Sequence, residues 1–282
     1  MSENPLLPPC PGPKLHAFQH QDAKIHWGRR VDDDRSNDGT EGFVFSVTIN
    51  SKIYALKVFK FFDPEDTRSF WEAHLGDSYP PEKIIFYTDP FYAKCRAFGR
   101  IQQAYDNQEI HHRRVLAVKC HGYMFLNKKD QLALEKKGCY FGADLLDDKI
   151  LRASGGNGRV RVNIVKDLEP DVGLNPRNIR TAFESVYALN QLKIYNRDVR
   201  AANFVNCRLV DFGLSWTEPH EILEALAKDE SRDEKLGDRV MFNDMIAVEG
   251  IKTRLNVLPD TGYWTKLRAW SKAEELVSLR RY

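Results

Sequence analysis

The segment 194–213 constrains the fold of this chain more than any other part of the sequence. It carries Asp198, then Asn203 five residues later, and Asp211 at the start of an Asp-Phe-Gly triplet. Because Asp211 follows Asn203 by only eight residues, the apolar residues between them must form two short strands joined by a tight turn at 206–207. This turn places Asp211 at the exit of a strand beside Asn203.

These three side chains suit the chemistry of phosphoryl transfer. That reaction needs a carboxylate beside the attacking hydroxyl and oxygen ligands that hold Mg²⁺ on the phosphates. Two Asp residues and one Asn at this spacing supply both. The alternative interpretation is a chance Arg-Asp pair and a chance Asp-Phe-Gly triplet, each of which is common alone.

A second informative region is the β-rich stretch 43–60, whose two apolar runs flank a turn signal at 50–52 and predict a hairpin. Lys57 in the second run shares a strand face with Ala55 and Phe59, so its side chain should point inward. A lysine on an apolar strand face is unfavourable unless it meets an anion. The alternative is an edge-strand lysine turned to solvent.

The two regions together resemble protein kinases. The first is similar to the catalytic and metal-binding loops of that family, and Tyr54-Ala55-Leu56-Lys57 is close to the kinase strand motif Val-Ala-Ile-Lys. The resemblance implies that Asp198 is the catalytic base and that Lys57 holds the α- and β-phosphates of ATP. It also implies that Asn203 and Asp211 bind Mg²⁺, with Asp211 as the main ligand.

Residues just before the hairpin are similar to the kinase glycine-rich loop. Gly39, Gly42 and Val44 match its last two glycines and its valine, while Asn37 stands where the first glycine belongs. Glycines there let backbone N–H groups approach phosphates. The resemblance therefore implies that these residues and Ala55 contact the nucleotide. The alternative is an ordinary Asp-Gly turn.

The chain is also similar to fungal kinetochore-complex subunits with a kinase-like fold. This resemblance rests on four segments, which are 54–61, 87–92, 95–101 and 120–123. It implies a kinase-like fold and a protein partner.

Lys94 is the main departure from the kinase pattern, because the family has a Glu at this position that pairs with the strand lysine. Two ammonium groups near one site repel each other, so we expect Lys94 to swing outward. Either Glu72 or Glu82 would then pair with Lys57, or the ion pair would be absent. On this interpretation Lys94→Glu should strengthen the site. A milder departure is Asn196, where kinases usually carry His.

The chain divides into three predicted regions. Residues 1–22 are rich in proline and are expected to form a disordered or extended tail. Residues 23–168 should form the small lobe, with a polar, glycine-rich surface insertion at about 127–158. Asp89-Pro90 predicts the start of a helix that runs to Tyr105.

Residues 169–282 should form a reduced large lobe that carries the catalytic and metal-binding loops. Only 69 residues follow Gly213, without an Ala-Pro-Glu motif, and they leave room for about three helices. We place these helices at 221–227, 236–249 and 263–279. The predicted fold class is therefore α+β, a two-lobed protein-kinase-like fold with an antiparallel β-sheet small lobe and a reduced, mainly helical large lobe.

Composition excludes several classes of function. The 42 basic and 40 acidic residues give a net charge of +2, which favours neither nucleic acid nor a membrane surface as a partner. The five cysteines lack the short paired spacings of a zinc site or a disulfide framework. With no signal-peptide pattern at the N-terminus, we expect an intracellular protein of the cytoplasm or nucleus.

The first functional hypothesis is an ATP- and Mg²⁺-dependent phosphotransferase whose acceptor is unknown, with a protein Ser or Thr favoured. The second is a pseudokinase, a scaffold subunit of a fungal kinetochore-type complex that has kept the fold without turnover. The third is a small-molecule phosphotransferase, favoured by the short large lobe. The expected partners are ATP and an unknown phosphate acceptor or protein.

Overall fold

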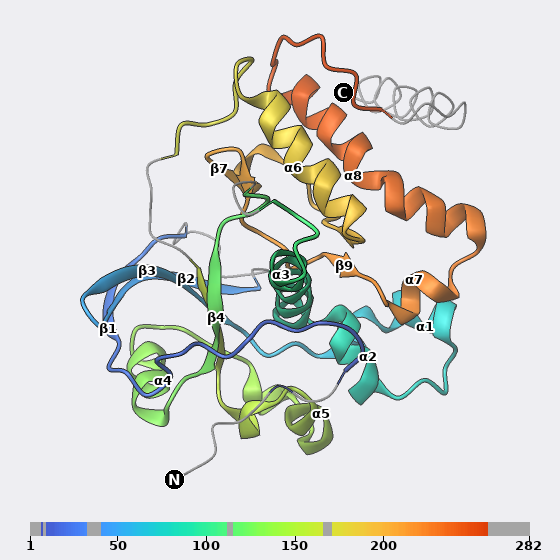
Figure 1. The fold of residues 1–282 in the computed structure, drawn as a ribbon. Helices are drawn as coiled ribbons and strands as arrows, with labels where there is room; N and C mark the ends of the chain where they lie inside the picture. Colours follow the sequence, from blue (N-terminus) through green and yellow to red (C-terminus); the bar gives the residue numbers. More distant parts are fainter. Residues whose placement is uncertain (1–6, 8–9, 33–40, 112–114, 166–170, 259–282) are drawn as a thin grey trace, which may run out of the picture.

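A five-stranded antiparallel sheet forms the first lobe, in the order β1-β2-β3-β5-β4. The computed structural model describes residues 7, 10–32, 41–111, 115–165 and 171–258. Within them the strands are β1 His26–Arg30, β2 Gly42–Ile49, β3 Lys52–Phe59, β4 Cys120–Phe125 and β5 Arg161–Val165. Figure 1 shows this sheet beside α3 (Pro90–Asp106), with the helices of the second lobe on the other side of α3.

The predicted hairpin of β2 and β3 is confirmed. Asn50 and Ser51 adopt φ values of 48° and 63° at its turn, a left-handed geometry that a two-residue hairpin loop requires. Apolar residues alternate along both strands, so one face, which includes Leu56 and Val58, is buried in a core of its own. The opposite face carries Lys57 and turns toward α3, because Phe59 on that face packs on Phe91.

Helices α1 (Arg68–Leu75), α2 (Pro81–Thr88) and α3 follow β3. The predicted start of α3 is confirmed, since the Asp89 side chain accepts a hydrogen bond from the Phe91 N–H at 2.8 Å. Helix α2 was not predicted, although Pro81 in its first turn is a recognised start signal.

The prediction of a disordered tail over 1–22 is wrong for the described part of it. The Leu15 N–H donates to the Cys95 carbonyl of α3 at 2.7 Å, and the Phe18 N–H donates to the Tyr123 carbonyl of β4 at 2.8 Å. The side chains of Leu15 and Phe18 are buried. Proline content suggested an extended tail, but these apolar side chains anchor it to the domain. Residues 1–6 and 8–9 lie outside the described residues.

The expected surface insertion at 127–158 contains α4 (Lys128–Glu135) and α5 (Asp148–Ala153). Leu134 and Phe141 from this segment join the core on the face of the sheet that is turned away from α3. The segment is therefore an integral layer of the small lobe and not only a surface insertion.

In the described part of the second lobe there are three helices and two small sheets. Its helices are α6 Ile179–Gln191, α7 Glu221–Ala225 and α8 Lys228–Val248, and its strands are β6 Ile194–Tyr195, β7 Phe204–Val205, β8 Arg208–Leu209 and β9 Trp216–Thr217. Short 3-10 turns occupy Pro64–Thr67, Ala143–Leu145, Gly156–Gly158 and Ala201–Asn203. Strand β6 pairs with β9, and β7 pairs with β8 as the predicted hairpin.

Several predictions for this lobe can be compared with the structure. Asn206 and Cys207 have φ values of 49° and 65°, which confirms the tight left-handed turn between β7 and β8. Helix α8 begins at Lys228, eight residues before its expected start. The predicted helix at 263–279 and the predicted lobe boundary at 168–169 lie outside the described residues.

The two lobes share α3 as a common core element. Its residues Phe91, Cys95 and Phe98 belong to one apolar cluster that continues to Phe212 and to Phe242 of α8. The structure is thus the α+β, two-lobed, protein-kinase-like fold that the sequence predicted, with a reduced and mainly helical large lobe (Figure 1). Across the described ranges, no helix has the length and apolar character that a membrane span requires.

Candidate functional site

The loop 196–203 is anchored by one buried carboxylate, that of Asp238. Asp238 of α8 accepts hydrogen bonds from the backbone N–H groups of Asn196 at 2.7 Å and Arg197 at 2.8 Å. Burial raises the pKa of the Asp238 carboxyl. Sequence reasoning missed Asp238, although it lies at helical spacing with Phe242 and Met245 on the buried stripe of α8.

Asn196 joins this loop to the Asp-Phe-Gly turn. Its Nδ2 donates to the main-chain carbonyl of Asp211 at 2.6 Å, and its Oδ1 accepts from the Asp198 N–H at 3.2 Å. The departure from the usual His at this position therefore preserves an anchor between the two loops.

Asp198 and Asn203 are in direct contact. Asn203 Nδ2 donates to the Asp198 main-chain carbonyl at 2.8 Å and to its Oδ2 at 2.7 Å, while Arg200 reaches the same Oδ2 at 3.1 Å. The Asn203 carbonyl accepts from the Val210 N–H at 3.0 Å, so the chain returns beside Asn203 just before Asp211. The tight connection expected from the sequence is formed as predicted.

Lys57 points inward and meets carboxylates. Its Nζ lies 2.6 Å from Glu41 Oε2 and 3.2 Å from Asp211 Oδ2. Burial opposes a charged amine, but the charges of Glu41 and Asp211 raise the pKa of Lys57. The predicted orientation of Lys57 is confirmed, and Glu41 is a partner that sequence reasoning missed.

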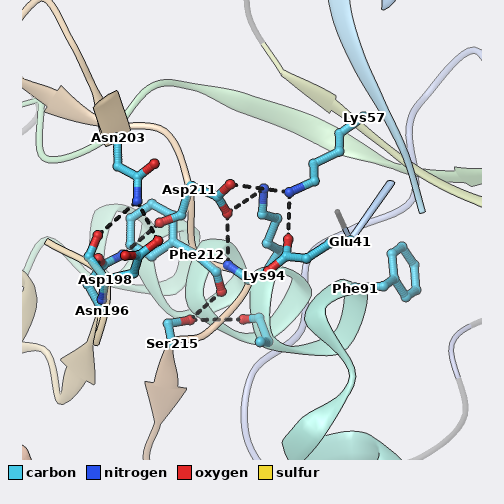
Figure 2. Close-up of polar contacts among 12 residues, drawn as sticks. Glu41, Lys57, Phe91, Lys94, Asn196, Asp198, Asn203, Asp211, Phe212 and Ser215 are labelled. Carbon is cyan, nitrogen blue, oxygen red and sulfur yellow. Dashed lines mark hydrogen bonds and ion pairs between the residues drawn. The ribbon is translucent and has the colours of Figure 1, made fainter. Parts of the chain in front are cut away.

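The expectation that Lys94 swings outward is wrong. Lys94 is buried, and its Nζ lies 2.9 Å from Asp211 Oδ1. The reason is charge balance, because Asp211 and Glu41 compensate the ammonium groups of both Lys57 and Lys94. Figure 2 shows the two lysines meeting at the Asp211 carboxylate, with Glu41 against Lys57. The ion pair with Asp211 also removes the reason to expect that Lys94→Glu strengthens the site.

The expected replacement partners for Lys57 are used elsewhere. Glu72 pairs with Arg68 at 3.1 Å, and Glu82 pairs with Lys149 at 2.9 Å. Glu41, at the entry to β2, provides the carboxylate that kinases supply from the helix. Its position beside the glycine-rich segment is the one signal in the sequence that could have drawn attention to it.

Gly213 makes room for Glu41. A Cβ atom at Gly213 would overlap the Glu41 carboxylate, so the glycine allows this close approach, and a larger residue would displace the flexible end of the Glu41 side chain. The Gly213 N–H also donates to Asp211 Oδ1 at 3.0 Å. Burial alone would raise the pKa of the Asp211 carboxyl, but the charges of Lys94 and Lys57 hold that pKa far below its usual range.

The candidate nucleotide-contacting residues lie in different settings. Gly39 lies outside the described residues. Gly42 is in β2 opposite Phe59, and a Cβ atom there would overlap the Val58 carbonyl oxygen, so this glycine serves strand packing. Val44 pairs in register with Lys57, which places both on the face turned toward α3. Ala55 lies on the same face of β3, one alternation away from Lys57.

The Mg²⁺ ion that the kinase resemblance implies does not fit this arrangement of donors. One oxygen of Asp211 accepts from Lys57, and the other accepts from Lys94 and from the Gly213 N–H. The Asn203 amide nitrogen donates to Asp198, which leaves only its Oδ1 as an atom that could contact a metal ion.

Fold and loops together define a protein of the protein-kinase-like class. The chain belongs to the family described as kinetochore Sim4 complex subunit FTA2, whose model matches residues 4–216. The match includes Lys57, Lys94 and Asp211, and it ends before the α8 helix that carries Asp238.

Among solved structures, vaccinia related kinase 3 is similar to the chain at 10% sequence identity and a TM-score of 0.36. The similarity covers 74% of this chain and 53% of that one, so the chain spans about half the length of the solved structure. No curated protein matches the sequence.

Proposed function

We propose that this chain is a protein-binding subunit of a kinetochore-type complex in the nucleus, and that it does not catalyse Mg²⁺-dependent phosphoryl transfer. The observation that carries the proposal is the contact of Lys94 Nζ with Asp211 Oδ1 at 2.9 Å. Family membership supports the protein partners and the nuclear location.

Electrostatics supports the loss of metal binding. A divalent cation about 5 Å from one ammonium group is repelled by about 7 kcal/mol at an effective dielectric constant of about 20. Two ammonium groups contact the carboxylate that such an ion would need. A metal ion on Asp211 would therefore be opposed by the charges of both lysines.

Helix α3 is fastened to the large lobe on both sides of Lys94. Arg96 donates to the main-chain carbonyls of Thr217 at 2.8 Å and of Pro219. The carbonyl of Ala93 accepts from Ser215 Oγ at 3.4 Å. These contacts tie the Lys94 turn of α3 to the large lobe, so a rotation of α3 that withdrew the ammonium group would break several hydrogen bonds.

The second candidate function is ATP-dependent phosphoryl transfer to a protein Ser or Thr or to a small molecule. It is favoured by the contact between Asp198 and Asn203 and by the anchoring of their loop on Asp238. In that function Asp198 would accept the proton of the acceptor hydroxyl, and Lys57 would orient the phosphates.

Transfer of the γ-phosphoryl group from labelled ATP distinguishes the two functions. We expect the full chain, with Mg²⁺ or Mn²⁺, to show no more transfer or hydrolysis than its Asp198→Asn variant. Asp233→Asn, which changes a carboxylate paired with a half-exposed arginine, is the matched control. Activity that survives in the control and disappears in Asp198→Asn would refute the proposal. A tagged Asp198→Asn chain should still concentrate at kinetochores in cells.

A further inference from the structure

We infer that Glu41, Lys57, Lys94 and Asp211 form an anion site that binds a polyphosphate without a divalent cation, and that the ligand displaces the Glu41 carboxylate. The inference rests on the proposed function because it requires that the ion pair between Lys94 and Asp211 persists. It goes beyond that function by assigning a ligand class to the site.

The four side chains form a neutral, layered cluster. The exposed fractions of the side chains are 3% for Lys94, 12% for Lys57, 24% for Glu41 and 31% for Asp211. The two cations are therefore deeper than the two anions that cover them. Two ammonium groups held beneath the surface are stable only while anions neutralise them.

Glu41 is the anion that can be exchanged. Its main-chain carbonyl is held by the Lys60 N–H at 3.0 Å, while its carboxylate is held by Lys57 and rests over Gly213. A change of side-chain torsion would remove the carboxylate without moving β2. Asp211 cannot be exchanged in this way, because both lysines and the Gly213 N–H hold it.

When the Glu41 carboxylate leaves, two positive charges and one negative charge remain, and the space above Gly213 becomes free. A phosphate group fits this vacancy chemically, since its oxygens accept from several ammonium N–H groups at once. A polyphosphate is favoured over a single carboxylate because its higher charge competes better with Glu41. Lys94 provides the positive charge that a metal ion would otherwise bring to the phosphates.

Calorimetric titration in the presence of EDTA tests the inference, with sodium tripolyphosphate and ATP as separate probes. We expect wild type to bind tripolyphosphate and Glu41→Gln to bind it at least about tenfold more tightly, because the competing charge is gone. Lys94→Met should weaken binding by at least about tenfold. Glu82→Gln is the matched control, since Glu82 is similarly exposed, at 28%, and pairs with Lys149 away from the site.

Adding Mg²⁺ should not strengthen binding to wild type. Similar affinities for the two probes would identify the phosphate chain as the determinant, whereas tighter ATP binding would add a nucleoside contribution; both results support the site. The inference is overturned if folded wild type and Glu41→Gln bind neither probe in EDTA, or if binding requires Mg²⁺. Should Glu41→Gln unfold in a thermal melt, the affinity of wild type and its loss in Lys94→Met decide the question.

These outcomes are separate from those of the proposed function. Phosphoryl transfer by wild type would refute the scaffold proposal while leaving metal-free polyphosphate binding to be measured directly. Absence of polyphosphate binding would remove the anion site and leave a catalytically silent scaffold unchanged.

Discussion

The substitution Asp211→Asn should affect the stability of the folded protein differently for the two possible roles of Asp211. If Asp211 is the counter-ion of two buried lysines, removing its charge destabilises the folded protein. If it were an unused metal ligand in a surplus of negative charge, the same change would leave stability in EDTA unchanged or raise it. Stability measured without metal therefore separates the two roles.

The structure gives the magnitude. At an effective dielectric constant of about 20, the contacts of Asp211 at 2.9 Å with Lys94 and 3.2 Å with Lys57 correspond to attractions of about 6 and 5 kcal/mol. Part of this is recovered, because Lys94 can lose its proton and Asp211 is partly solvated. Breaking a buried pair typically costs about 3–5 kcal/mol, so we expect a loss of about 2–4 kcal/mol at pH 7.

The loss should also depend on pH. Burial and the charge of Lys57 lower the pKa of Lys94 to about 8 in the wild type. Without the Asp211 charge this pKa falls further, so folded Asp211→Asn holds a neutral Lys94 at pH 7 while the unfolded chain holds a charged one. An amine whose pKa is lowered in the folded state destabilises the protein less as pH rises. The difference in unfolding free energy between Asp211→Asn and wild type should therefore shrink by about 1 kcal/mol between pH 7 and pH 9.

Urea unfolding in EDTA measures the effect at both pH values. Asp198→Asn is the matched control, because Asp198 pairs with Arg200, whose side chain is 66% exposed, and exposed pairs contribute less than about 1 kcal/mol. The new Asn side chain also keeps an oxygen that can accept the hydrogen bond from Asn203. An Asp211→Asn protein that is as stable as wild type, or more stable, would show that the lysines do not depend on Asp211. The charge cluster would then have no role in stability.

Three further predictions concern the framework around the site. Gly42→Ala should destabilise the protein by about 2–3 kcal/mol or more, because the new Cβ overlaps the Val58 carbonyl. Gly237→Ala in α8 should stabilise the protein by about 0.5–1 kcal/mol, because a Cβ there meets no other atom and alanine favours the helix. Urea unfolding measures both changes. Asp238→Asn should cost about 1–3 kcal/mol, since its amide cannot accept all the N–H groups that the carboxylate does. Burial and a neighbouring arginine hold the pKa of His220 well below its usual value, so stability should fall by up to about 1.4 kcal/mol per pH unit below pH 6.5, and His220→Asn should flatten this slope.

Each of these predictions has a clear contrary result. Equal unfolding midpoints for Gly42→Ala and wild type would mean that β2 and β3 can separate at little cost. Hydrogen exchange that is unchanged at 196–197 in Asp238→Asn would show that the loop does not depend on α8. A wild-type slope of stability against pH in His220→Asn would assign the acid sensitivity to another group.

Local patterns in the sequence predicted the parts of the site that are close together along the chain. The turn between β7 and β8 follows from an eight-residue separation and from Asn206, and the inward orientation of Lys57 follows from strand alternation. Both depend on backbone geometry within a few residues. The general architecture follows from the same kind of pattern, repeated over each strand and helix.

Other features were missed although the sequence held a signal for them. Pro81 at the first turn marked helix α2, and Leu15 and Phe18 marked an anchored tail. The spacing of Asp238 with Phe242 marked a buried carboxylate. In each case the prediction followed an overall property of the segment, such as its proline content or polarity, and not the one or two residues that indicated the structure.

The sequence by itself determined the fold class, the tight connection between Asn203 and Asp211 and the direction of Lys57, because periodicity and short loops fix which neighbours can meet. Only the tertiary structure decided the charge pattern around Asp211. Glu41, Lys57, Lys94 and Asp211 come from four separate segments, and their distances depend on the β2–β3 register and on how α3 packs between the lobes. Since ion pairing depends on separations of a few ångströms and on burial, the state of Lys94 could not be derived from its place in a motif.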